Sequence, residues 1–122
     1  MANIETVRAY CLAKPGTSEG FPFDEETLVF KVMDKMFAVC TLEDPDWFVL
    51  KCDPERAIEL REQYACIEGA YHFNKKYWNQ HCLSQLDDAL IYELIDHSYD
   101  EVVKKMTKKM RAELAAMSNS QE

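Results

Sequence analysis

The segment AYHFNKKYWNQHC, residues 70–82, gathers side chains that could bind a metal, take part in catalysis or contact nucleic acid. His72, His81 and Cys82 carry the imidazole and thiol groups that zinc prefers. Because neighbouring residues of a strand point to opposite faces, His81 and Cys82 cannot both face one ion. No second cysteine or carboxylate stands at ligand spacing nearby. We therefore predict structural roles for these residues, with no metal site and no cofactor.

The middle of this segment has the composition of a hairpin turn. Asn74 suits a turn because its side chain can hydrogen-bond to the backbone two residues on. Lys75 and Lys76 would protrude from the tip, where ammonium groups meet phosphates and a nearby ring meets a base or sugar. Two interpretations stay open: a wing that touches nucleic acid, or an ordinary hairpin in which Trp78 anchors the sheet.

The chain offers no arrangement for catalysis or nucleotide hydrolysis. A nucleophile needs a neighbouring base and a third group that orients the base, and no such trio can be assembled. Gly69 is isolated, and no glycine-rich phosphate-binding motif occurs. We therefore expect that the protein is not an enzyme.

Charge is unevenly distributed along the 122 residues. The formal net charge of −8 counts against sequence-independent DNA binding. However, residues 84–103 hold six acids and no Lys or Arg, whereas residues 104–111 hold five bases and no acid. The bases lie near a predicted helix C-terminus, which favours cations. They are Lys104, Lys105, Lys108, Lys109 and Arg111. This cluster could cooperate with the hairpin tip if the fold brings the two together.

Hydrophobic spacing predicts the elements that position these groups. Helical periodicity covers residues 4–14, the segment that opens with Asp53 as N-cap and Pro54, and a final helix from Asp87 whose spacing extends to Met117. Residues 17–26 read as a loop. Strands are indicated at 27–33, 36–42, 47–52, 67–73 and 77–83, the first three as an antiparallel meander with a turn at Asp34-Lys35. The order α-β(3)-α-β(2)-α predicts an α+β fold, an antiparallel sheet with helices packed on it.

Length and composition predict one domain at residues 1–117 and a disordered tail at 118–122. The five cysteines are an odd number without metal-ligand spacing, as in reduced thiols of a cytosolic protein. No apolar run approaches the ~20 residues that a membrane span needs, and the first residues do not resemble a signal peptide. We expect a cytoplasmic protein that makes no use of the membrane.

Five segments in order resemble the MmcQ/YjbR-like family of bacteria. They are YCLAKPG (10–16), KVMDKMFA (31–38), LKCDPERAIELR (50–61), HFNKKYW (72–78) and LIDHSYDEVVKKM (94–106). The resemblance implies the same α-β(3)-α-β(2)-α order, similar to secretion-chaperone-like domains. It also implies DNA binding, through similarity to a phage double-wing transcription-factor domain.

The family's polar hairpin motif falls on His72, Asn74, Lys75 and Trp78, and with Lys76 these are the predicted nucleic-acid contacts. The position before the tryptophan, often His in the family, is Tyr77 here. Two functions remain open: DNA binding through a basic hairpin wing, or an acidic, chaperone-like module that presents a sheet or helix face to a protein partner or a second copy. A basic strip linking the hairpin tip to residues 104–111 would favour nucleic acid, and an isolated tip would favour the module.

Overall fold

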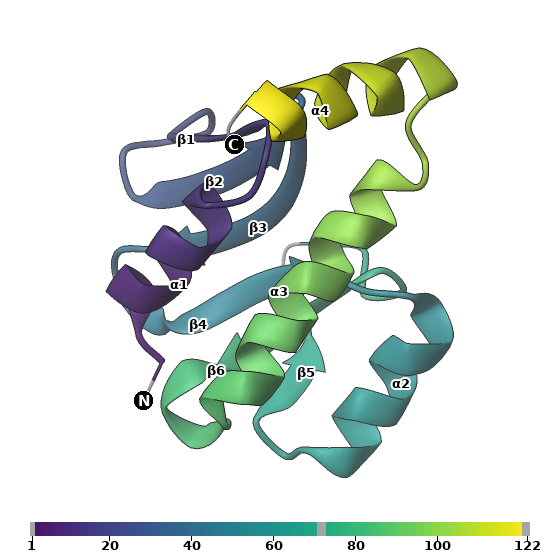
Figure 1. Ribbon diagram of the computed structural model, residues 1–122. Helices are drawn as coiled ribbons and strands as arrows, with labels where there is room; N and C mark the ends of the chain where they lie inside the picture. The colour runs from purple at the N-terminus through teal and green to yellow at the C-terminus, as the bar shows by residue number, and fades with distance from the viewer. Residues whose placement is uncertain (1, 71–72, 121–122) are drawn as a thin grey trace.

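Three consecutive strands form the centre of the sheet in the computed structural model, which describes residues 2–70 and 73–120 (Figure 1). β2 (Thr27–Val32), β3 (Lys35–Thr41) and β4 (Asp44–Lys51) pair antiparallel in chain order, so the predicted meander is confirmed. The β2–β3 turn uses Met33 and Asp34, with φ of 49° and 66°, one residue earlier than predicted. Positive φ at both central residues is typical of a type I′ turn, whose twist matches that of the flanking strands.

Shorter strands complete the sheet on both sides. β1 (Thr17–Gly20) pairs with β2 at one edge, while β6 (Trp78–Cys82) pairs with β4 and carries β5 (Ile67–Gly69) at the other edge. In the described part of the chain, the order is β1-β2-β3-β4-β6-β5. The prediction of a loop at residues 17–20 was wrong, because TSEG has no apolar alternation and forms a strand only by pairing with β2.

The strands of the hairpin are shorter than predicted. β5 ends at Gly69 rather than at residue 73, and β6 begins at Trp78 rather than at residue 77. A hydrogen bond of 3.0 Å from the Ala70 amide to the Trp78 carbonyl closes the ladder, and the chain then bends away into the turn. A short 3₁₀ helix, η1 (Leu83–Gln85), follows β6.

The first two predicted helices are present as α1 (Ile4–Leu12) and α2 (Pro54–Gln63). Asp53 caps α2 as predicted, since its side chain accepts a hydrogen bond of 3.1 Å from the Arg56 amide. Val7 and Cys11 form the buried face of α1. Both helices therefore begin where their sequences indicate.

The final helix is broken in two, which corrects the prediction of one continuous helix. α3 (Asp88–Val103) ends just before the lysine-rich segment 104–111, and α4 (Lys108–Ser120) begins within it, after Thr107. The Thr107 hydroxyl accepts a hydrogen bond of 3.1 Å from the Met110 amide, the bond of an N-cap. The helix α4 also includes residues 118–120 of the predicted tail, while residues 121–122 lie outside the described residues.

The helices and the sheet form an α+β fold, as predicted. In Figure 1 α1 and α3 lie in front of one face of the sheet, with α2 beside β5. Alternate residues of the central strands, such as Phe30, Phe48 and Leu50, meet these helices in the buried core. The intervening residues point to the other face, where no described helix packs. We call this second side, which carries Val29, Val39 and Val49, the open face.

None of the helices within residues 2–70 and 73–120 is both long and apolar enough to cross a membrane.

Candidate nucleic-acid interface

The hairpin between β5 and β6 turns at Asn74, as the sequence predicts. The Asn74 carbonyl accepts hydrogen bonds of 3.0 Å from the amides of both Tyr77 and Trp78. Its side-chain oxygen accepts another of 3.0 Å from the Lys76 amide, which forms an Asx turn. The predicted site residue His72 lies outside the described residues. The role of Asn74 in the structure is therefore to shape the turn.

Helix α2 holds this turn in place through Arg61. One guanidinium nitrogen of Arg61 donates to the Lys75 carbonyl at 2.8 Å and to the Asn79 side-chain oxygen at 3.0 Å. Asn79 is fully buried and donates in turn to the Ala57 carbonyl at 3.2 Å. Sequence reasoning missed Arg61, because periodicity places it on a helix face without showing that the hairpin lies opposite.

Trp78 is a sheet-face anchor, one of the two roles considered from the sequence. It stands beside Lys51 in the β4–β6 register and points to the open face. Its ring lies 5.4 Å from that of Phe73, centroid to centroid, in a tilted contact. Trp78 therefore joins the turn to the sheet.

The two lysines of the tip lie in different surroundings. The stem of Lys75 lies against Gly69, where an added Cβ would come within 3.0 Å of the Lys75 Cγ. The Lys76 ammonium instead lies over the Tyr77 ring, 5.4 Å from its centroid. Lys105, from the segment between α3 and α4, places its ammonium 5.0 Å from the same centroid. The fold thus brings the hairpin tip and the second basic cluster together at Tyr77.

Lys51 lies near Lys105 and joins this group, and we call Lys51, Lys76 and Lys105 the lysine corner. Burial, and next the positive charge of Lys105, lower the pKa of Lys51 below its ordinary value. Lys104 and Lys35 act in the same direction, while Glu101 opposes them. Glu101 is itself paired with Lys104. The corner is therefore a concentration of positive charge, opposed in part by Glu101, on a chain of formal net charge −8.

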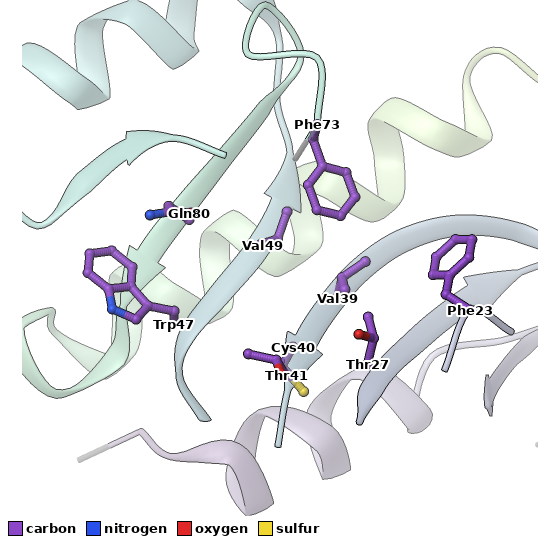
Figure 2. A pocket seen from close by; sticks show the side chains of 9 residues that line it. All are labelled: Phe23, Thr27, Val39, Cys40, Thr41, Trp47, Val49, Phe73 and Gln80. Carbon is purple, nitrogen blue, oxygen red and sulfur yellow. The ribbon is translucent and has the colours of Figure 1, made fainter. Parts of the chain in front are cut away.

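The open face carries a hollow of about 390 Å³. Val39 and Val49 form its floor, and three aromatic side chains, Phe23, Trp47 and Phe73, stand around it (Figure 2). Phe23 is 67% exposed although it is a large apolar residue. The strand register places Trp47 and Val49 on the face opposite Phe48.

Two of the residues first considered for metal binding, His81 and Cys82, have structural roles. His81 is buried among core residues, and its Nδ1–H donates to the Phe48 carbonyl at 2.9 Å. Burial lowers the pKa of His81 to about 4, so the ring is neutral near pH 7. Cys82 points the other way and donates to Asp46 at 2.6 Å. Among the residues that the structure describes, no group of His, Cys, Asp and Glu could hold a metal ion.

Comparisons with known proteins agree with the resemblance seen in the sequence. The model of the YjbR family matches residues 12–101. YjbR of Escherichia coli K12, described as uncharacterised, is 34% identical over 110 residues, which cover 88% of this chain and 93% of that protein. YbdF of Escherichia coli O157:H7, also described as uncharacterised, is 31% identical over 107 residues, with 86% and 88% covered.

Two crystal structures share the fold. The protein DR2400 of Deinococcus radiodurans, which carries a domain named DUF419, superimposes with a TM-score of 0.87 at 41% identity, covering 94% of this chain and 89% of that one. A protein from Pseudomonas syringae gives a TM-score of 0.68 at 26% identity, covering 80% and 96%. Because the family model matches most of this chain, the chain belongs to the YjbR family.

Proposed function

We propose that this protein binds DNA and that the lysine corner contacts the phosphate backbone. The observation that carries the proposal is the convergence of Lys76 and Lys105 on the Tyr77 ring, at 5.4 and 5.0 Å. One lysine comes from the hairpin tip and the other from the segment after α3. Their meeting is the link between the two basic regions that would favour nucleic acid over an isolated tip.

Electrostatics supports an anionic ligand at this corner. Like charges held together raise the free energy of the free protein, and a phosphate group between them removes that cost. The lowered pKa of Lys51 reflects this crowding in addition to burial. Ammonium groups bind phosphates as point charges and release counterions from the nucleic acid, which gives affinity without sequence preference.

The proposal includes the cytoplasmic location and the non-enzymatic role expected from the sequence. All five cysteines are unpaired in the structure. Free thiols are typical of a reducing compartment, where DNA is accessible to a small bacterial protein.

The test is binding of a labelled DNA duplex at two salt concentrations. We expect binding at low salt that weakens as salt rises. Lys76→Ala and Lys105→Ala should each weaken binding and lower the slope of log affinity against log salt by about one. Lys75→Ala should have a smaller effect, because the Lys75 stem lies against Gly69.

Arg8→Gln serves as the matched control. Arg8 is an exposed cation of α1, paired with Glu19 at 2.7 Å on the helix-covered side of the sheet. Its loss changes the net charge by the same amount as the loss of a corner lysine and should leave the salt slope unchanged. No binding at low salt, or an equal loss in the Arg8 variant, would contradict the proposal.

A protein-interaction module is the second candidate, and the hollow of the open face is the observation that favours it. Exposed apolar patches mark interaction sites for proteins as well as for other ligands. The acidic net charge is also compatible with this function. Stable self-association of the protein together with an absence of DNA binding would favour the module.

A further inference from the structure

The strand register places Lys51 of the lysine corner on the same side of the sheet as the hollow. Phe73 lines the hollow and also contacts the Trp78 ring at 5.4 Å. Trp78 stands beside Lys51 in the strand register, and Lys51 belongs to the corner. Adjacent strands lie about 4.8 Å apart, so aromatic surface and positive charge are neighbours on the same side of the sheet. A ligand that carries both rings and negative charge can reach the two together.

The lining of the hollow suits flat apolar rings. Phe23, Trp47 and Phe73 surround a floor of two valines, and the volume of about 390 Å³ lies within the range of small-ligand sites. Unpaired bases have free π-faces that stack on aromatic side chains, whereas the bases of a duplex already stack on each other. A hollow of this kind can therefore accept a base only from an unpaired strand.

The charges at the two ends of the strands give such a ligand one orientation. Thr27 and Thr41 line one end of the hollow, and the exposed acids Glu26 and Glu43 lie one residue before Thr27 and two residues after Thr41. Glu26 and Glu43 lie close enough there for a hydrogen bond with Glu43 to raise the pKa of Glu26. Phosphates are repelled from this end and attracted to the lysine end, so the bases point across the hollow.

We infer that the ligand of this surface is a single-stranded nucleic acid, with unpaired bases on Phe23, Trp47 and Phe73 and phosphates on the lysine corner. This inference rests on the proposed DNA binding and specifies the form of nucleic acid that is preferred. It also assigns a role to the aromatic hollow, which contact with the phosphate backbone alone would not require.

The experiment compares two probes by fluorescence anisotropy at one salt concentration. One is a labelled oligothymidylate of about 15 nucleotides, within the site sizes of small single-strand-binding domains, and the other is the same strand annealed to its complement. We expect tighter binding of the single strand. Phe23→Ala and Phe73→Ala should each weaken single-strand binding about 10-fold and leave duplex binding nearly unchanged.

Ile58→Ala is the control, because Ile58 is a 50% exposed apolar residue of α2 that does not line the hollow. It should leave both affinities unchanged. Phe23 is so exposed that its truncation leaves the core intact, so its result stands even if the Phe73 variant unfolds. Circular dichroism of each variant verifies folding before binding is measured.

Four outcomes separate this inference from the proposed function. Selective loss of single-strand binding in the Phe23 variant supports it. Equal or tighter binding of the duplex, or equal losses for both probes, overturns it and leaves DNA binding in place. Failure to bind either probe overturns both proposals. Unchanged single-strand affinity in the Phe23 variant, with loss of self-association in sedimentation, overturns the inference and assigns the hollow to a protein partner.

Discussion

Neighbouring residues of β4 and β6 point to opposite faces of the sheet, and the two faces differ in how deeply their side chains are buried. On the covered face, Phe48 and His81 are buried and hydrogen-bonded or packed beneath the helices. On the open face, Trp47 and Val49 are only half-buried and border a hollow. Residues one position apart in sequence therefore differ in what they contribute. The covered face stabilises the fold, and the part of the open face around Trp47 and Val49 is accessible to a ligand.

Phe48→Ala should give the largest change in stability. Phe48 is fully buried, and its ring lies 6.3 Å from that of Phe30, centroid to centroid. Truncation of a buried Phe costs about 3 to 5 kcal/mol, a large part of the stability of a small domain. Urea denaturation measures the loss. Where the alanine variant does not fold, Phe48→Leu should reduce the free energy of unfolding by about 1 kcal/mol. A loss below 1 kcal/mol for alanine would mean that the covered face is not the core.

Acid should destabilise the protein through His81, on the covered face. The pKa of the folded imidazole is lowered by burial to about 4, while the unfolded one titrates near 6.5. The unfolded state therefore binds the proton first, and stability falls as pH drops from 6.5 to 4. The contribution is about 3 kcal/mol over that window.

His81→Gln tests this effect, because an amide can still donate to the Phe48 carbonyl but does not titrate. Urea denaturation at several pH values should show a smaller decrease in stability for the variant than for the natural chain. The acidic residues titrate in both proteins, so the difference between the two curves isolates His81. Parallel curves would contradict a buried neutral histidine.

Ser98→Ala should have an intermediate effect on stability. The Ser98 hydroxyl, buried in α3, donates to the Phe37 carbonyl at 2.5 Å and accepts from the Lys51 amide at 2.9 Å. Alanine leaves both backbone groups without this partner, at a cost of about 2 kcal/mol in the free energy of unfolding. Ser18→Ala, on the edge strand β1, is the control and should change stability by less than about 0.5 kcal/mol. Equal effects of the two variants would contradict the bridging role of Ser98.

Elements with strong local patterns could be predicted from the sequence. The meander and α2 follow from alternation, from helical periodicity and from the Asp53 cap. Strand β1 could not be predicted, because TSEG has little apolar character and its stability comes from pairing with β2. The break before α4 depends on Thr107, whose capping role is hidden within a lysine-rich run. Tertiary contacts decide these features, and local patterns do not contain them.

The candidate site shows the same division. The turn at Asn74 could be predicted because Asn has a specific local chemistry in turns. Lys76 and Lys105 meet at Tyr77 from segments that are far apart in the chain. Residue spacing could therefore not predict their contact, and the sequence showed only that the two basic regions would cooperate if the fold brought them together. The contact of Arg61 with the hairpin turn could not be predicted either, because it depends on how α2 packs beside the hairpin.

Val49→Thr gives the smallest expected change in stability and the sharpest test of the comparison. Valine and threonine have nearly the same shape and both favour strands, so the sheet geometry is retained. On the open face the new hydroxyl meets solvent in the hollow, and we expect a change below about 0.5 kcal/mol in urea denaturation. In the hollow the hydroxyl replaces part of the apolar floor beneath a bound base, so single-strand affinity should fall a few-fold while duplex affinity stays unchanged.

Ala38→Ser is the matched control, because it places a hydroxyl on the neighbouring strand but on the covered face. Burying this hydroxyl should reduce the free energy of unfolding by about 1 to 3 kcal/mol. A stability loss in Val49→Thr as large as that in Ala38→Ser would mean that the two faces are equally buried, and the division between folding and function would fail.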